Sequence, residues 1–305
     1  PRRPSGTYLS PAPNLDGMNG TGVPLVTPFE ESGAIDHERL REVTSWVTDR
    51  GVDFVVPCGA NGEAELMTLD ERAAVVETVA DAASVPVLAG TGHPGYVETR
   101  EATRRAAAAG ADGALVVTPF YYDHDSDDIV AYYEHLASES NLTIYLYSVP
   151  KMTGTRLAPE TVGVLATHEN IHGMKDSAGD LTAFRRTRDR TGEAFDLFVG
   201  SGNLYAPALD AGAAGGIMAL ANVVPELAAE IGRRHRAGDP DRARALNDDL
   251  IALNRAVTAR FGVAGVKEAM RYRGAPAGHV RSPHSPLDED ASHEVRRLVD
   301  EALPE

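Results

Sequence analysis

The chain has 305 residues, of which 43% are hydrophobic, and its 45 Asp and Glu residues against 29 Lys and Arg residues give a formal net charge of −16. An acidic surface repels phosphate backbones and anionic lipids, so we expect neither a nucleic-acid nor a membrane partner. A single cysteine, Cys58, excludes an internal disulfide framework. No apolar run is long enough to cross a bilayer, and residues 1–19 have no hydrophobic signal-peptide core, so we expect a soluble, cytoplasmic protein.

The predicted elements begin after residues 1–19, which we expect to form a flexible N-terminal tail or a cloning remnant, with Met18 as the native start. From residue 20 onward, short apolar runs alternate with longer amphipathic runs, a rhythm typical of βα units and a parallel sheet. Strands are predicted at 22–28, 53–58, 85–90, 113–118, 142–148, 171–175, 195–200 and 214–220. Helices are predicted between them, for example at 36–50, 69–83, 96–109 and 127–139. These units predict an α/β fold, a TIM (β/α)8 barrel over residues 20–224.

The pattern changes at residue 225, after which only helices are predicted. They span 225–237, 240–259, 264–273 and 288–303. This is more helix than one closing barrel helix requires, so residues 225–305 are predicted to be a C-terminal helical appendage packed on the barrel. No low-complexity linker precedes them, which argues against an independent second domain.

Lys175 is the residue that most strongly suggests a reaction. It ends a short predicted strand after the uncharged residues 171–174, and the active site of a TIM barrel lies at the carboxyl ends of its strands. Burial lowers the pKa of a lysine and yields the neutral amine that attacks a carbonyl. The competing interpretation is a lysine that reaches solvent or pairs with Asp176. The other two lysines, Lys151 in a polar loop and Lys267 on an amphipathic helix, are predicted to be surface residues.

Tyr147 ends the neighbouring predicted strand, so its phenol is expected to meet Lys175 at the barrel mouth. Carbinolamine chemistry needs a group that donates and accepts protons near the amine, and a phenol can do both. The alternative is a buried tyrosine with a satisfied hydroxyl, and Tyr145 on the same face competes for the role. Glycine-rich loops after the second and seventh strands leave backbone N–H groups free to hold a carboxylate.

Two other motifs do not support a cofactor site. Residues 90–95 match GxGxxG, but the acid expected after the next strand is absent, since Thr and Pro stand at 118–119. His168 and His172 are four residues apart, but residues 169–170 resemble a turn between them, so they do not share a helix face. We therefore expect neither a dinucleotide nor a metal.

A set of short motifs occurs in order along nearly the whole chain, from Gly20 to Leu287. They are LVTPF at 25–29, GANGE at 59–63, LxxxER at 66–72, AGTG at 89–92, VTPFYY at 117–122, YSVPKMTG at 147–154, GMKDSAGD at 173–180, GSGN at 200–203 and GGIMALANVVP at 215–225. Each alone is weak, but the ordered set resembles the dihydrodipicolinate synthase / N-acetylneuraminate lyase superfamily of class I aldolases.

This resemblance implies a role for several residues. Lys175 would form the Schiff base, Tyr147 would shuttle protons, and Tyr121 would reach into the site of a neighbouring subunit. The residues implied in binding the 2-oxo acid are Gly59, Ala60, Asn61, Ser177, Gly202 and Ile217. The resemblance also implies a homotetramer or homodimer, a pyruvate-type substrate and no cofactor beyond the covalent Schiff base.

Two departures from the family pattern affect the expected substrate. Ala60 and Asn61 stand where the family usually has hydroxyl residues, so the proton relay lacks one hydroxyl or takes it from elsewhere. Met152 stands where dihydrodipicolinate synthases place an arginine, and a thioether cannot bind a carboxylate as an arginine does. Met152 therefore argues against a synthase that binds an aldehyde bearing a carboxylate.

The motif details are most similar to the 4-hydroxy-2-oxoglutarate aldolase branch. We therefore expect a class I aldolase or lyase that makes or cleaves a carbon–carbon bond next to a pyruvate-derived enamine, of the 4-hydroxy-2-oxoglutarate or 2-keto-3-deoxy sugar acid type. The first alternative is 4-hydroxy-tetrahydrodipicolinate (dihydrodipicolinate) synthase, which condenses pyruvate with aspartate semialdehyde. The second is a catalytically silent 2-oxo acid-binding member, which Ala60 keeps open.

Overall fold

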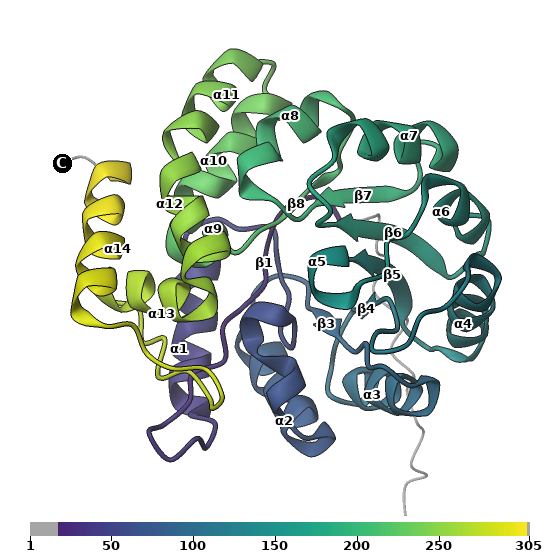
Figure 1. Ribbon diagram of the computed structural model, residues 1–305, viewed down its shortest axis with the longest axis horizontal. Helices are drawn as coiled ribbons and strands as arrows, with labels where there is room; N and C mark the ends of the chain where they lie inside the picture. The colour runs from purple at the N-terminus through teal and green to yellow at the C-terminus, as the bar shows by residue number, and fades with distance from the viewer. Residues whose placement is uncertain (1–17, 304–305) are drawn as a thin grey trace, which may run out of the picture.

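Eight parallel strands form the centre of the protein, in a computed structural model that describes residues 18–303 (Figure 1). The strands are β1 (Gly20–Val23), β2 (Phe54–Val55), β3 (Leu88–Gly90), β4 (Gly113–Val117), β5 (Thr143–Ser148), β6 (Ile171–Asp176), β7 (Asp196–Val199) and β8 (Gly215–Ile217). Their order in the sheet is β2-β1-β8-β7-β6-β5-β4-β3, and a parallel bridge between Val55 and Val87 closes the ring. The predicted TIM barrel is confirmed; most of the predicted tail, residues 1–17, lies outside the described residues.

The first strand differs most from its prediction at 22–28, because it ends at Val23. Pro24 cannot donate a ladder hydrogen bond, so residues 24–28 continue as a loop at the carboxyl end of the strand. The strand begins earlier, at Gly20, in a glycine-rich sequence with no apolar signal. Gly22 has to be a glycine, since a Cβ there would lie 2.3 Å from the Phe54 ring.

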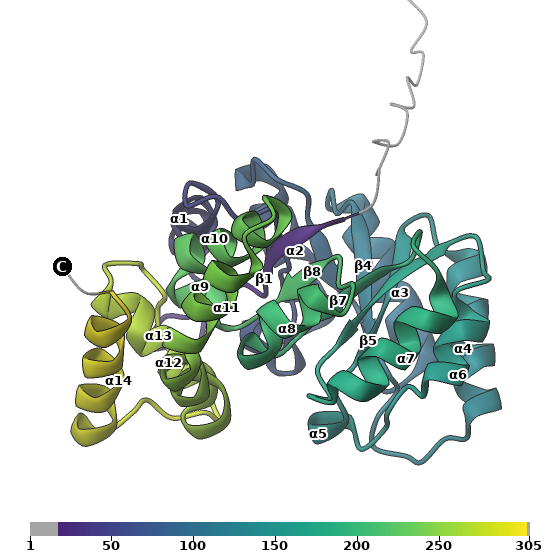
Figure 2. The same ribbon diagram turned by 90° about the horizontal axis from the view of Figure 1, so that it is seen from above.

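Helices surround the barrel (Figures 1 and 2). Those of the first half are α1 (His37–Thr48), α2 (Leu69–Ala82), α3 (Tyr96–Ala108) and α4 (Ser126–Glu139), within two residues of their predicted ends. Those of the second half are α5 (Pro150–Thr153), α6 (Pro159–Leu165), α7 (Leu181–Thr191), α8 (Tyr205–Asp210) and α9 (Leu220–Val223). No helix within residues 18–303 is long and apolar enough to span a membrane.

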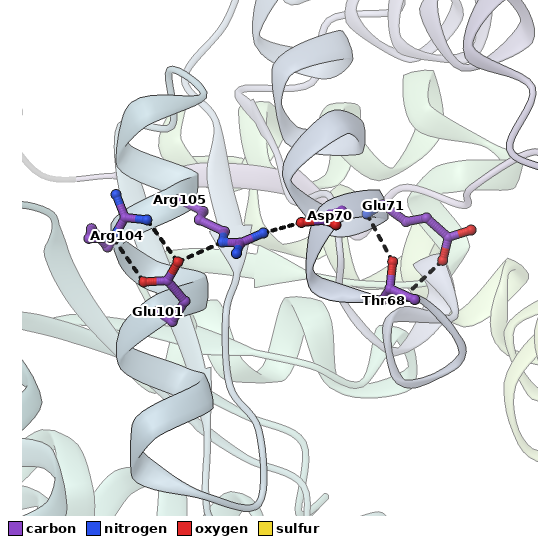
Figure 3. Close-up of polar contacts among 6 residues, drawn as sticks. All are labelled: Thr68, Asp70, Glu71, Glu101, Arg104 and Arg105. Carbon is purple, nitrogen blue, oxygen red and sulfur yellow. Dashed lines mark hydrogen bonds and ion pairs between the residues drawn. The ribbon is translucent and has the colours of Figure 1, made fainter.

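The start of α2 is fixed by a capping box. The Thr68 hydroxyl accepts a hydrogen bond from the backbone N–H of Glu71, whose carboxylate accepts one from the N–H of Thr68. Figure 3 shows this cap beside an ion pair between Asp70 and Arg105, which links α2 to α3. Because α2 follows the loop after β2, the cap fixes the residue at which the helix begins.

The C-terminal helices are α10 (Pro225–Arg236), α11 (Pro240–Asp249), α12 (Ile251–Arg255), α13 (Gly262–Tyr272) and α14 (Glu289–Ala302), with a π-helical turn at 256–260 between α12 and α13. Figure 2 shows α13 and α14 at the end of the molecule opposite α4 and α6. Helix α10 packs against β1 and α8. We therefore propose to count α10 as the eighth barrel helix and to begin the appendage at α11.

Side chains fill the inside of the barrel, so it contains a packed core. This inner cluster contains Met18, Phe54, Val56, Leu88, Leu115, Tyr145, Tyr147, Val149, Phe198 and Ile217. Phe54 and Phe198 meet edge to face, with ring centroids 5.3 Å apart. Gly173 leaves space for Tyr145, since a Cβ at that glycine would lie 2.6 Å from the ring. Lys175 lies two residues further along the same strand, and therefore on the same inward face.

Candidate active site

Lys175 and Tyr147 lie side by side at the carboxyl ends of β6 and β5. The two residues are register partners in the parallel ladder between these strands. The Lys175 side chain crosses the phenol ring, with its Nζ 4.3 Å from the ring centroid. Both are buried, and Lys175 is only 6% exposed. The predicted meeting of these two side chains at the barrel mouth is therefore present in the structure.

The neighbouring carboxylate does not neutralise Lys175. Among residues 18–303, the lysine that forms an ion pair is Lys267. Asp176 instead accepts a hydrogen bond at 2.7 Å from the backbone N–H of Ala178, and burial raises the pKa of its carboxyl group. A buried amine that has an aromatic face beside it and no bound carboxylate is well suited to react as a nucleophile.

Tyr145, the competing tyrosine, is part of the packed core of the barrel. Its hydroxyl donates a 2.9 Å hydrogen bond to Asp196 at the opposite end of the barrel from Lys175. Burial raises the pKa of Tyr145, and burial likewise raises that of Asp196. Of the two tyrosines on this face of β5, Tyr147 alone is close to Lys175.

The loop after β2 forms a 3-10 turn over Ala60–Gly62. The N–H of Gly62 donates to the Gly59 carbonyl at 3.0 Å, and the N–H of Glu63 donates to the Ala60 carbonyl at 3.1 Å. The N–H groups of Ala60 and Asn61 have no acceptor within the described part of the chain. The binding of a carboxylate by this loop stays a prediction, for which these two backbone N–H groups are the available donors.

A cavity of about 140 Å³ opens beside this turn. Its lining is mainly apolar and includes Gly59, Ala60, Phe120, Tyr147, Val149 and Met152. Tyr147 connects the cavity to Lys175, because it lines the one and contacts the other. Met152 is 67% exposed at the rim, so it presents a thioether to anything that enters the cavity.

The remaining predicted binding residues follow β6, β7 and β8. Ser177 is held by a 2.9 Å bond from its N–H to the Ser148 carbonyl, and its side chain fills the space where a Cβ of Gly200 would lie. Gly202 accepts a hydrogen bond from Asn247 on α11 at 2.7 Å. Ile217, the last residue of β8, is buried in the inner barrel cluster with Tyr147. The contacts of these three residues within the described part of the chain do not test whether they bind a ligand.

Tyr121 does not join this site within its own chain. It is 85% exposed and has a left-handed backbone, with a φ of 84°. Its ring packs edge to face on the exposed Tyr122, with 5.0 Å between the centroids. The implied action of Tyr121 in a neighbouring subunit therefore stays a prediction.

The prediction for Lys267 as a surface residue is wrong. Its side chain is 0% exposed, and its Nζ lies 2.6 Å from a carboxylate oxygen of the equally buried Glu63. Burial lowers the pKa of Lys267 to about 8, against the opposing effect of Glu63. An amphipathic helix pattern does not reveal this, because the partner is 204 residues away in the sequence. Lys151 is exposed, as predicted.

Comparison with known proteins identifies the family of the chain. The family model for the dihydrodipicolinate synthetase family matches residues 18–302. The chain is 38% identical to an uncharacterized DapA-like lyase of Halobacterium salinarum, over 92% of this chain and 94% of that protein. It is 36% identical to the 4-hydroxy-tetrahydrodipicolinate synthase of Methanothrix thermoacetophila, over 90% of this chain and 94% of that protein.

Among solved structures, dihydrodipicolinate synthase from Acinetobacter baumannii in complex with pyruvate matches with a TM-score of 0.90, at 29% identity, over 94% of this chain and 99% of that one. YagE from E. coli, also in complex with pyruvate, matches with a TM-score of 0.89 at 28% identity, over 93% of this chain and 98% of that one. From the family match over residues 18–302 and from relatives above 30% identity, the chain belongs to the dihydrodipicolinate synthetase family of carbon–carbon lyases.

Proposed function

We propose that Lys175 forms a Schiff base with a 2-oxo acid of the pyruvate type and that the resulting enamine makes or breaks a carbon–carbon bond. Family members act through such a lysine adduct and take no external cofactor. The observation that carries the assignment to Lys175 is its position. It is a buried amine near the end of β6, beside a phenol, and no carboxylate of residues 18–303 forms an ion pair with it.

The reaction proceeds through proton transfers that need a nearby acid and base. The neutral amine adds to the C2 carbonyl to give a carbinolamine, and loss of water leaves an iminium ion. Loss of a proton from C3 gives the enamine, which attacks an aldehyde; the reverse sequence cleaves the product, and water finally releases the 2-oxo acid. Tyr147, whose ring lies against Lys175, is the group placed to carry these protons.

The substrate carboxylate is assigned to the turn at Gly59–Asn61. Gly59 and Ala60 border the cavity, and the N–H groups of Ala60 and Asn61 have no acceptor among the described residues. Ser177, Gly202 and Ile217 are assigned to the pocket wall. We also assign Tyr121 to the site of a second copy of the chain, in a homodimer or homotetramer, because an exposed tyrosine with a strained backbone is otherwise unexplained.

Two partner substrates have support. The names of related synthases, such as those of Methanothrix thermoacetophila and Haloarcula marismortui, favour aspartate semialdehyde. The apolar cavity and the exposed thioether of Met152 favour an aldehyde without a carboxylate at that position, as in the aldolase reactions expected from the sequence. Condensation of aspartate semialdehyde at a rate comparable to the cleavage of 4-hydroxy-2-oxoglutarate or 2-keto-3-deoxy sugar acids would select the synthase.

The Schiff-base step is tested by trapping. The full chain is incubated with pyruvate, reduced with borohydride and analysed by peptide mass spectrometry. We expect an adduct on Lys175 that is absent from Lys175→Ala, with Lys151→Ala as the matched lysine control. An adduct that persists in Lys175→Ala would overturn the assignment, and an adduct without turnover of any 2-oxo acid would identify a binding protein.

A further inference from the structure

A buried ion pair ties the C-terminal helices to the turn after β2. Lys267 on α13 and Glu63 at the end of the turn have side chains that are 0% exposed, with 2.6 Å between Nζ and Oε1. The same ammonium group donates to the carbonyl of Thr27 at 2.7 Å and to that of His279 at 2.5 Å. All three protons of the ammonium group are therefore used, and they join the loop after β1, the loop after β2 and the segment after α13.

The second carboxylate oxygen of Glu63 is held as firmly as the first. It accepts a 2.8 Å hydrogen bond from the backbone N–H of Arg281 and lies 3.0 Å from Nδ1 of His284. Glu63 also has a left-handed backbone, with a φ of 55°, which a residue with a side chain adopts only when its surroundings impose it. The contacts to its carboxylate hold the side chain in place and so favour this backbone conformation.

This strained residue immediately follows the Ala60–Gly62 turn. The N–H of Glu63 closes the turn on the Ala60 carbonyl, so a change in the backbone at Glu63 would rotate the peptide groups that precede it. A buried ion pair is seldom needed for stability, because apolar side chains of the same volume often stabilise a core as well. A fixed geometry is what the pair adds.

We propose that Glu63 and Lys267 are positioning residues that hold the Gly59–Gly62 turn in the shape that receives the substrate carboxylate, an inference that rests on the proposed function. The appendage is then a working part of the active site, because Lys267, Arg281 and His284 all lie beyond the barrel. The pair touches no reacting atom. It acts through the direction of the two free N–H groups, those of Ala60 and Asn61.

The test measures the pyruvate concentration that half-saturates the borohydride-trapped adduct on Lys175, together with the midpoint of thermal unfolding, Tm. In Lys267→Met we expect half-saturation to rise roughly 10- to 100-fold, the loss expected when one or two hydrogen bonds to a carboxylate are misdirected. The adduct at saturating pyruvate stays as complete as in the wild type. Glu63→Gln is expected to change half-saturation in the same direction and serves if Lys267→Met does not fold.

A double variant separates positioning from stability. Glu63→Gln with Lys267→Met removes both buried charges, so its Tm recovers relative to Lys267→Met, while half-saturation stays high. Glu226→Gln is the matched control: it breaks the ion pair of Glu226 with Arg273, which joins α10 to the end of α13 away from the turn. This control is expected to lower Tm and leave half-saturation unchanged.

The positioning role would be overturned if folded Lys267→Met or Glu63→Gln reached half-saturation at the wild-type pyruvate concentration. It would also be overturned if both Tm and the half-saturating concentration returned to their wild-type values in the double variant. A failure of the proposed function looks different, because the wild-type chain would then give no adduct on Lys175 at any pyruvate concentration.

Discussion

Substitution of Tyr145 and of Tyr147 tests whether the first tyrosine of β5 stabilises the core and the second takes part in catalysis. Both tyrosines face the inside of the barrel from one strand, two residues apart, and each can lose its hydroxyl through substitution by phenylalanine. The ring remains in both variants, so the packing of the inner barrel cluster is kept. Differences between the variants therefore report what each hydroxyl does.

For Tyr145→Phe we expect a stability loss and little change in turnover. The variant removes the 2.9 Å hydrogen bond to Asp196 and leaves a half-buried carboxyl group with one donor fewer. Such a bond to a charged acceptor contributes about 1.5–3 kcal/mol to the free energy of unfolding. In a protein of this size, that loss lowers Tm by roughly 2–6 °C.

For Tyr147→Phe we expect the reverse. Its ring still covers Lys175, so Tm should stay near the wild-type value, while turnover falls about 100- to 10,000-fold with the loss of a positioned acid and base. The assays are thermal unfolding and pyruvate release from the preferred aldol substrate. Equal turnover losses in the two variants, or full turnover in Tyr147→Phe, would refute the division of roles.

Three further predictions concern β1, the loop after β2 and the start of α2. Burial raises the pKa of the Cys58 thiol from 9.0 to about 11, so the unfolded chain loses this proton first as pH rises from 9 to 11. The free energy of unfolding should therefore fall more steeply over this range in the wild type than in Cys58→Ala, and equal slopes would refute this. Gly22→Ala should lower the free energy of unfolding by about 1–3 kcal/mol, because the new Cβ would lie 2.3 Å from the Phe54 ring. Gly59→Ala, which has open space around the new Cβ, should unfold at the wild-type temperature. Thr68→Ala removes the cap of α2 and should cost about 1 kcal/mol in denaturant unfolding, an expectation that an unchanged midpoint would contradict.

Much of the fold was predictable because its signals are local. Each strand from 113 to 199 lies within a residue or two of its predicted bounds, since an apolar run between two amphipathic helices has few other interpretations. The first strand was harder. Gly20 and Gly22 are required there because the side chains of Asp53 and Phe54 occupy the space that a Cβ would fill. Strand propensity carries no information about such a contact.

The site divides in the same way. Lys175 and Tyr147 were predictable because parallel strands bring their carboxyl ends together, which makes sequence position a guide to spatial position. Glu63 and Lys267 were not, because each is one half of a pair whose members are far apart in the chain. The available signal for burial was a charged residue within an otherwise apolar stripe of a helix, such as Lys267 after Val266. In an amphipathic helix this signal is easily taken for a residue of the polar face.

Ala60 and Met152, the two positions that depart from the expected motifs, lie on a 3-10 turn and a short helix after the strands, while the predicted reaction centre lies on the strands themselves. Lys175 and Tyr147 are fixed by the ladder between β5 and β6, so their geometry is expected to stay the same whatever the second substrate is. Met152 lies at the rim of the cavity on the short α5, where a change of side chain alters what enters without moving the strands. Under the proposed function the turn binds the carboxylate through its backbone N–H groups, so Ala60 is expected to leave that binding intact. The Ala60 substitution should therefore affect proton transfer, and the Met152 substitution the choice of aldehyde.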